Sequence, residues 1–387
     1  MSAEPAEEFF DADTHVAPAS FADLSPLLSP YWRDYALGAA LRVDPVQAGA
    51  YPPAMVEGPA PHDVATLRAA VLDPPVPGGG RVTTAVLTCT TAFDVSRNHA
   101  FEAALCRAVN IWVAQRFLDH EPRARGSVAV PLGDPAAAVA EIEHWADDPR
   151  FVQVLLPVRG HDLRWGHPVF RPVLAAAAAA GLVVTLHAWG RVGSAPTTTG
   201  FTHTYLQDYL SHGQVAQSQL VSLVAEGALG ALPGLRVTVA ECGSSWLPPL
   251  LWRLDKEWRG IRREVPWVDR MPSQYVREQV RFTTAPVHLP RDPGELRDAL
   301  DVLGAAEILL HAGDHPHRHG DGAARLLAAL DPAARVAVRH GNATAWYRGS
   351  DTAWYRGADT AWYRGPDTAA TPSPSFASTH HVPEVPR

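Results

Sequence analysis

The sequence predicts an α/β fold, a distorted (β/α)8 barrel of the TIM type, from three observations. Short β-rich runs alternate with helical stretches along most of the chain, which is the pattern of parallel strands joined by crossover helices. The length of 387 residues and the hydrophobic content of 47% suffice for the large core of a one-domain barrel. An open, doubly wound sheet is the alternative. The third observation is the number of strands, because eight strands with crossovers favour a closed barrel. They are expected at residues 9–15, 84–89, 127–130, 151–156, 183–187, 236–241, 281–285 and 307–314.

One region, residues 17–80, does not follow this alternation. It is long and rich in proline, with Pro52-Pro53 and Pro74-Pro75. It follows the first strand directly, on the face where barrel enzymes build their sites. Because long loops in compact domains are usually lids or insertions, we expect a cap over the pocket. Helices are expected at residues 135–146, 168–180, 215–231, 250–261 and 293–303.

The C-terminal region is a second exception, so the expected organisation is a barrel at 1–348 and a tail at 349–387. From Ala343 the octapeptides ATAWYRGS, DTAWYRGA and DTAWYRGP follow one another, and a Pro/Ser/Thr-rich segment comes after them. An octapeptide is too short for a helical solenoid unit. We interpret the repeat as a duplicated, disordered tail without a catalytic role. The alternative is that its Trp and Tyr side chains dock on a partner subunit in a homodimer.

Charge and cysteine content restrict the partners and the compartment. The net charge of −8 argues against nucleic acid and anionic membrane, because both bind basic patches. Three cysteines form no spaced disulfide framework. No signal peptide is visible, and the longest apolar run, at 172–188, is too short to span a bilayer. We expect a cytoplasmic protein that acts on a small molecule, and the single lysine, Lys256, indicates a GC-rich bacterial genome.

The first expected strand carries three polar residues on one face. In FFDADTH, residues 9–15, the side chains of Asp11, Asp13 and His15 alternate and should point the same way. Polar groups on the inward face of a buried strand are costly unless they are paired or bind a metal. At the C-terminal end of a barrel strand they are placed as ligands. The alternative is an Asp–His hydrogen bond in the core.

Three other expected strands also end in a potential ligand. These are His187, Glu241 and Asp314, and the last is followed by His315, His317 and His319 in an expected loop. Taken singly, each could be an ordinary core or loop residue. Four strands that all end in His, Asp or Glu at the same edge predict a mixed nitrogen and oxygen ligand set, as in catalytic Zn²⁺, Mn²⁺ or Fe²⁺ sites.

These segments resemble the amidohydrolase-related family of the metal-dependent hydrolase superfamily, which includes aminocarboxymuconate-semialdehyde and resorcylate-type decarboxylases. The resemblance runs from Asp11 to Tyr347. It rests on DADTHV, HPVFRPVLAAAAAAGLVVTLHAWG, PGLRVTVAECGSSWLPPLLWRLD, MPSQYV, HAGDHPH and GNATAWY, in that order. It implies a barrel with one divalent metal ion (Zn, or Mn or Fe) and the metal ligands Asp13, His15, His187 and Asp314.

The chain departs from the family pattern at two positions, which bear on the reaction. Asp13-x-His15 replaces the His-x-His of the hydrolases and looks more like the Glu-x-His of the decarboxylases. Glu241 stands where the decarboxylases carry a histidine after the sixth strand. We expect hydrolysis of an amide, lactone or related carbonyl by metal-activated water, with Asp314 as base and Glu241 as proton shuttle.

Two other functions stay open at this point. Decarboxylation of a carboxylated aromatic or unsaturated acid would use the same metal site, with Asp314 or Glu241 protonating the carbon. A metal-free scaffold or binding protein would have kept only the fold. For either enzyme, Trp189, Arg191 and His317 are the expected substrate contacts, because an aromatic pocket with an arginine suits a planar carboxylated ligand. The alternative is that the aromatic residues near the strand ends pack between barrel and helices.

Overall fold

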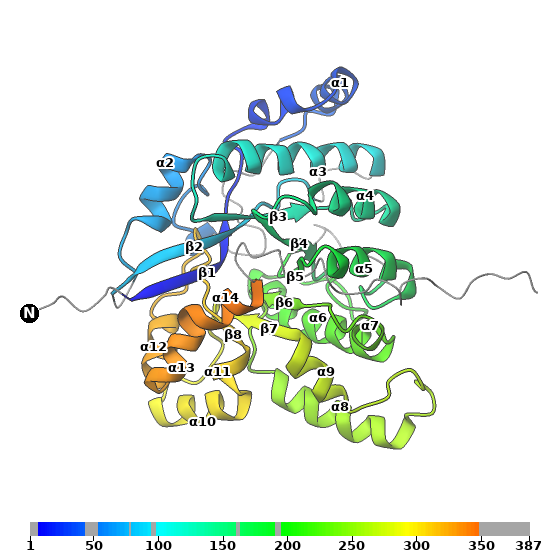
Figure 1. Ribbon diagram of the computed structural model, residues 1–387, viewed down its shortest axis with the longest axis vertical. Coiled ribbons are helices and arrows are strands. Elements are labelled where there is room, and N and C mark those ends of the chain that lie inside the picture. Colours follow the sequence, from blue (N-terminus) through cyan, green and yellow to red (C-terminus); the bar gives the residue numbers. More distant parts are fainter. Residues whose placement is uncertain are drawn as a thin grey trace, which may run out of the picture. The chain divides into compact units, whose positions relative to one another are not determined.

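The computed structural model describes residues 7–42, 53–76, 79–93, 98–159, 163–189 and 195–347. Its eight strands form one parallel sheet in the order β1 to β8, with helices between them (Figure 1), which confirms the expected (β/α)8 barrel. The expected tail at 349–387 lies outside the described residues. The strands are β1 (Glu8–His15), β2 (Arg81–Thr88), β3 (Ala124–Ala129), β4 (Phe151–Pro157), β5 (Val183–His187), β6 (Val237–Ala240), β7 (Val280–Thr283) and β8 (Leu309–Leu310).

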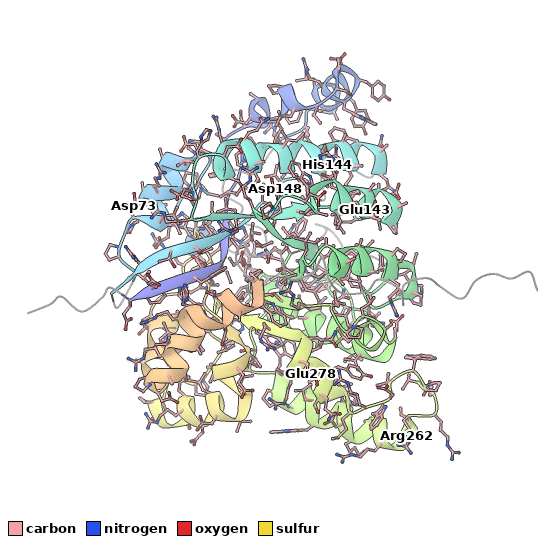
Figure 2. The ribbon with its side chains drawn as sticks, in the orientation of Figure 1. Asp73, Glu143, His144, Asp148, Arg262 and Glu278 are labelled. Carbon is pink, nitrogen blue, oxygen red and sulfur yellow. The ribbon has the colours of Figure 1, made fainter. Side chains whose placement is uncertain are left out.

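The helices cover the outside of the strand ring. Charged side chains such as Glu143, Arg262 and Glu278 lie on these outer segments (Figure 2). No described helix combines the length and the apolar character that a membrane span requires. The main helices are α3 (His99–Val113), α4 (Pro135–Trp145), α5 (Arg171–Ala179), α6 (Tyr205–Ala225), α7 (Ala228–Ala231), α8 (Leu247–Ile261), α9 (Pro272–Gln279), α10 (Pro293–Leu303), α11 (Ala305–Ile308), α12 (Gly322–Ala329), α13 (Pro332–Val336) and α14 (Asn342–Tyr347).

Two expected elements differ from those observed, each near a glycine with positive φ. The expected strand at 307–314 is shorter, because Gly304 (φ 74°) starts the one-turn helix α11 and β8 begins only at Leu309. The expected helix at 215–231 is divided at Gly227 (φ 76°) into α6 and α7. α6 also begins earlier, at Tyr205, because Thr204 and Gln207 form a capping box.

Backbone hydrogen bonds join the first strand to the end of the last and close the ring. The Ala12 N–H donates to the His311 carbonyl, the Asp314 N–H to the Asp13 carbonyl, and the His15 N–H to the His315 carbonyl, each at 2.9 Å. We call this the β1–β8 seam. It places the last residues of β1 directly beside the loop that follows β8.

The core has two parts, one inside the ring and one outside. Phe10, Val152 and Leu310 come from β1, β4 and β8, and residues from strands this far apart in the ring can meet only within it. Trp346 and Tyr347 of α14 join this inner cluster, where Tyr347 stacks on Phe10 with ring centroids 5.6 Å apart. The larger cluster fills the layer between strands and helices.

The described parts of the proline-rich insertion contain short helices. These are η1 (Phe21–Asp23), η2 (Ser25–Leu27), α1 (Pro30–Gly38), η3 (Pro53–Met55), α2 (Val64–Leu67) and the π-helix η4 (Arg68–Leu72). The segment around Glu57 contacts the loop after β8. The Glu57 N–H donates to the Pro316 carbonyl at 2.8 Å, and the Glu57 carboxylate pairs with Arg318 at 3.1 Å. Part of the insertion thus lies against the C-terminal ends of the strands.

Candidate metal centre

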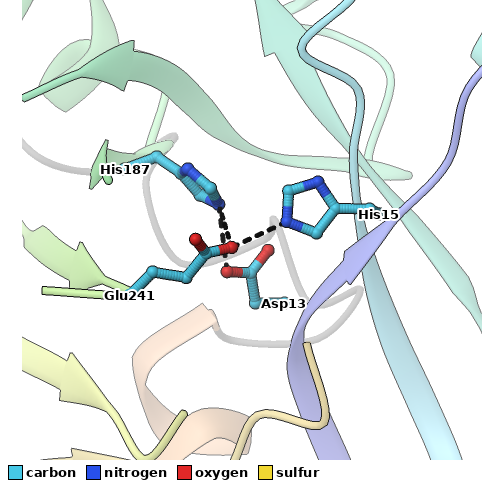
Figure 3. A group of neighbouring side chains, drawn as sticks. All are labelled: Asp13, His15, His187 and Glu241. Atoms are coloured by element: carbon cyan, nitrogen blue, oxygen red, sulfur yellow. Dashed lines mark hydrogen bonds and ion pairs between the residues drawn. The ribbon is translucent and has the colours of Figure 1, made fainter. Parts of the chain in front are cut away.

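Four strand-end side chains converge in a buried cluster (Figure 3). Asp13 and His15 come from the end of β1, His187 ends β5, and Glu241 follows β6 directly. Each offers one ligand atom, and these atoms all lie within 4.8 Å of one another. All four residues are at most 2% exposed. Three segments far apart in the sequence therefore place nitrogen and oxygen donors around one point.

The ligand atoms of this first group are in close contact. His15 Nε2 lies 2.7 Å from Glu241 Oε1, and His187 Nε2 lies 3.0 Å from the same oxygen. His187 Nε2 is also 3.2 Å from Asp13 Oδ2. Glu241 thus occupies the middle of the cluster, although the ligand set implied by the family resemblance did not include it.

Asp314 belongs to a second group that overlaps the first, together with His15, Glu241 and His317. Its Oδ1 lies 3.2 Å from His15 Nε2 and 2.8 Å from His317 Nδ1. Its Oδ2 lies 2.6 Å from His319 Nε2. Both carboxylate oxygens of Asp314 are therefore held by histidines, two of them from the loop after β8.

Backbone conformation aims two of these carboxylates into the cluster. Glu241 and Asp314 have φ values of 57° and 55°, in the left-handed region that non-glycine residues seldom adopt. Such a conformation costs on the order of 1–3 kcal/mol and persists only where the surroundings impose it. For Asp314 the seam bond to the Asp13 carbonyl does so, and for Glu241 the N–H donates to Thr283 Oγ1 at 3.2 Å.

Asp11 does not join the cluster, contrary to the expectation from strand alternation. The pairing of β1 with β2 shifts register between Asp11 and Thr14, as in a β-bulge, so the alternation changes phase there. Asp11 Oδ1 instead accepts the N–H groups of Gly313 at 2.9 Å and Asp13 at 3.1 Å. The carboxylate of Asp11 therefore lies beside the β1–β8 seam and not among the ligand atoms.

The donor set fits a divalent metal ion. Among the described residues, Asp13 Oδ2 and His187 Nε2 have no hydrogen-bond partner although both are buried. They face each other at 3.2 Å, and unpartnered buried polar atoms are costly. An ion about 2.0–2.3 Å from two ligands at right angles would hold them about 3 Å apart, close to the observed separations. The geometry thus leaves these atoms available to a cation.

The electrostatics of the cluster point the same way. Burial lowers the pKa of His15, but hydrogen bonds to Asp314 and Glu241 outweigh it and raise that pKa to about 10. Burial also opposes a charged His187, yet Glu241 and Asp13 hold its pKa well above the ordinary value. Three buried carboxylates, Asp13, Glu241 and Asp314, lie in two overlapping groups around the same histidines and require compensating positive charge, which a bound divalent cation would supply.

The residues expected to contact substrate have different positions. His317 is buried against Asp314, inside the cluster and not in a solvated loop. Trp189, two residues after His187, packs against Phe93 with ring centroids 4.3 Å apart. Arg191 lies outside the described residues. His319 was not singled out from the sequence as a site residue; the spacing H-x-H-x-H after Asp314 was the signal that could have identified it.

The family model described as amidohydrolase matches residues 10–349 of the chain. The chain belongs to the amidohydrolase family. This confirms the resemblance found in the sequence, and it covers almost the whole described barrel.

A curated protein and two solved structures are similar to this chain. Gamma-resorcylate decarboxylase from Rhodococcus jostii is 25% identical over 264 residues, 63% of this chain and 76% of the relative. The structure of 5-carboxyvanillate decarboxylase from Sphingomonas paucimobilis has a TM-score of 0.63 and 23% identity, covering 89% of this chain and 99% of that one. Dihydroxybenzoic acid decarboxylase from a Polaromonas species, with bound manganese and the inhibitor 2-nitroresorcinol, has a TM-score of 0.61 and 18% identity, covering 88% and 97%.

The curated relative supports an enzyme, as expected, but it overturns the expected reaction. Hydrolysis of an amide or lactone was the wrong choice, because that relative is a decarboxylase, which was the alternative. The physical reason is that both reactions use the same strand-end ligands. The strand ends alone therefore could not separate hydrolysis from decarboxylation. The absence of a histidine at position 241 was not enough to favour hydrolysis.

Proposed function

We propose that this protein is a metal-dependent, non-oxidative decarboxylase of a hydroxylated aromatic carboxylic acid. The match to gamma-resorcylate decarboxylase over 264 residues carries the proposal. The buried cluster of two histidines and two carboxylates, with Asp314 beside it, supports it as a site of suitable chemistry. The product would be carbon dioxide and a phenol.

The proposed ion is held by Asp13, His15 and His187, with Glu241 and Asp314 completing the donor set. When bound, a divalent cation acts as a Lewis acid toward the substrate's carboxylate and a neighbouring oxygen. Imidazole suits Zn and Fe, while carboxylate oxygens suit Mn, so a mixed set rich in carboxylates is compatible with Mn²⁺. A manganese-bound relative is consistent with that choice.

The chain's own acid is proposed to be Asp314. Loss of carbon dioxide leaves the electron pair of the broken bond on the ring carbon, and a proton must replace the carboxyl group there. Asp314 Oδ2 contacts His319 Nε2 at 2.6 Å, and His319 is the most exposed of the cluster histidines, with 11% of its side chain accessible. Glu241 Oε1 contacts both His15 and His187, whereas Asp314 has a second oxygen, Oδ2, on the more exposed His319, so Asp314 is the better placed of the two to move a proton.

Exclusion of water is the second contribution of the chain. The residues of the four-residue group are at most 2% exposed, and in such a site fixed charges act more strongly than in water. We propose that the insertion at 17–80 acts as the cap, with the contact of Glu57 to the loop after β8 as its described anchor. Trp189 is proposed to face a planar substrate, together with Arg191.

The test is direct measurement of carbon dioxide. The protein is stripped with a chelator, reloaded with Mn²⁺ or Zn²⁺, and incubated with 2,6-dihydroxybenzoate and 5-carboxyvanillate. We expect metal-dependent release of carbon dioxide and of the matching phenol, and loss of both with His187→Ala. Absence of carbon dioxide from a panel of hydroxybenzoates, at full metal content, would reject the proposal.

A further inference from the structure

A cavity of about 420 Å³ lies outside the strand ring, apart from the four-residue group. Val71 of η4 and Leu327 of α12 contribute to its walls, and so do Asp11 of β1 and His311, which follows β8. The loop after β8 forms another side, including His317 and His319, which contact Asp314 on the cluster. Its volume is in the range of small-molecule sites.

Two buried polar groups line this cavity. Asp11 is 3% exposed and His311 is 5% exposed. Among the described residues, His311 Nδ1 has no hydrogen-bond partner. The two backbone N–H groups that Asp11 accepts both end on its Oδ1, so its Oδ2 can accept from a ligand. A buried polar atom without a partner is costly, so a ligand with a donor would be stabilised here.

The remaining lining limits the ligand to an uncharged molecule. Much of the wall is apolar, including Val76, Val82 and Ala285. An anion would be repelled by Asp11, and a cation would lose its hydration in a largely apolar space. The Glu57–Arg318 ion pair at the edge is satisfied internally, at 3.1 Å.

We propose that this cavity is a second binding site, for a small uncharged molecule with an apolar body and a hydroxyl donor, as in a phenol. The hydroxyl donates to Asp11 Oδ2 or His311 Nδ1, and the ring lies against the apolar walls. Phenols are also the product class of the proposed reaction. The identification of the ligand with that product rests on the proposed function, whereas the site does not.

An occupant of this site would be coupled to the metal centre through one short path. Asp11 accepts the N–H of Gly313, and the next residue, Asp314, belongs to the second group of ligand atoms. A ligand that hydrogen-bonds to Asp11 therefore acts on Gly313, the residue beside Asp314. Binding here is expected to change the metal affinity or the turnover, as product feedback would.

The test uses the metal-loaded full-length protein and 4-fluorophenol, followed by fluorine NMR. We expect wild type to bind it outside the metal site and Ala324→Phe, which fills the cavity from α12, to lose that binding. Ala328→Phe, an exposed position on the same helix, is the matched control and should behave as wild type. Asp11→Asn replaces an acceptor by an amide and should weaken binding at least about tenfold, and 4-fluoroanisole, which lacks the donor, should bind as weakly.

Crystals soaked with 4-bromophenol give a readout that does not depend on any variant folding. Anomalous density for bromine between η4 and α12 would support the site; density only at the metal cluster would overturn it, as would unchanged binding to a folded Ala324→Phe. If the cavity stays empty while carbon dioxide is still released, only this inference falls. If the cavity binds the phenol but no hydroxybenzoate is decarboxylated, the proposed function falls and the site stands.

Discussion

Glu241 shows how much one side chain decides in this centre. Its Oε1 is the atom that both His15 and His187 contact, at 2.7 and 3.0 Å, and it belongs to both ligand groups. A left-handed backbone conformation, unusual for glutamate, directs it there. Glu241, expected from the sequence as a strand-end donor and proton shuttle, therefore lies among the candidate ligand atoms.

Glu241→Gln tests this placement, because the amide keeps the shape and removes one negative charge. We expect the affinity for Mn²⁺ to fall at least about 10–100-fold, the scale seen for residues that support metal sites. Glu143→Gln, on the exposed face of α4, is the control and should bind as wild type. Calorimetry and metal analysis measure the change. Lost turnover with unaltered affinity would instead return Glu241 to proton transfer.

His311 gives a second test at the same scale, through the pH dependence of stability. Burial lowers the pKa of this histidine to about 4, so the folded protein binds its proton only below that pH, whereas the unfolded chain binds it below about 6.5. The contribution of the neutral His311 to the free energy of unfolding is therefore fully present above pH 6.5, and it is lost as the pH falls toward 4. By linkage the loss from pH 7 to pH 5 is about 2 kcal/mol.

His311→Asn should reduce that loss, because asparagine does not titrate. Urea unfolding at pH 7 and pH 5 compares the two proteins, and the variant is expected to have the smaller difference even if it is less stable overall. An equal difference in both proteins would show that other groups account for the acid sensitivity.

The β1–β8 seam is the element on which the site depends. Its backbone bonds join Asp13 to Asp314, and the β-bulge before Thr14 turns Asp13 toward the cluster while Asp11 turns to the seam. The ligands from β1 and β8 thus share one backbone framework, so a small shift in the seam moves both. His187 and Glu241 come from the other side of the ring.

Gly313→Ala is the sharpest change to this element. An added Cβ would lie 2.7 Å from Asp11 Oδ2, closer than real Cβ contacts, so the carboxylate or the loop has to shift. We expect a destabilisation of about 1–3 kcal/mol and weaker metal binding, because Asp314 is the next residue. Gly260→Ala in α8, where the added Cβ meets nothing within 4 Å, is the control. Unfolding curves and metal titrations of both variants decide, and normal metal affinity in Gly313→Ala would show that the seam tolerates the shift.

At the scale of the whole molecule, the last described helix closes the inner core. Trp346 and Tyr347 of α14 are 7% and 4% exposed and join residues from the strands inside the ring. The Trp346 indole N–H also donates to Thr238 Oγ1 at 3.0 Å. Residues 343–347, the described part of the first octapeptide copy, are thus part of the barrel.

Two truncations distinguish these parts. A chain ending at Gly349 should fold and keep its activity, as the interpretation of the tail predicts. A chain ending at Gly341 should lose on the order of 3–5 kcal/mol or fail to fold, because it removes the buried aromatic residues. Thermal unfolding and sedimentation measure both. If the longer truncated chain loses activity or dissociates from an oligomer, the tail is an interface and not a dispensable duplication.

The sequence by itself determined the barrel and the residues that meet at the C-terminal edge of its strands. Strand and helix periods are local, and parallel strands in a barrel bring their C-terminal ends to one edge, so strand ends in Asp13, His15, His187, Glu241 and Asp314 sufficed to predict a shared centre.

Only the tertiary structure decided which of these polar residues enter the cluster and how their side chains are placed in it. The bulge that removes Asp11, the left-handed turn at Asp314 and the positions of His317 and His319 depend on contacts between β1 and the loop after β8, about 300 residues apart in the chain. The left-handed turn at Glu241 depends on Thr283, which follows it by 42 residues. No local pattern encodes such contacts, because their geometry is set by closure of the ring. Neither the sequence pattern nor the tertiary structure decided between hydrolysis and decarboxylation, because one ligand set can serve either reaction. Similarity to a decarboxylase favoured the second reaction.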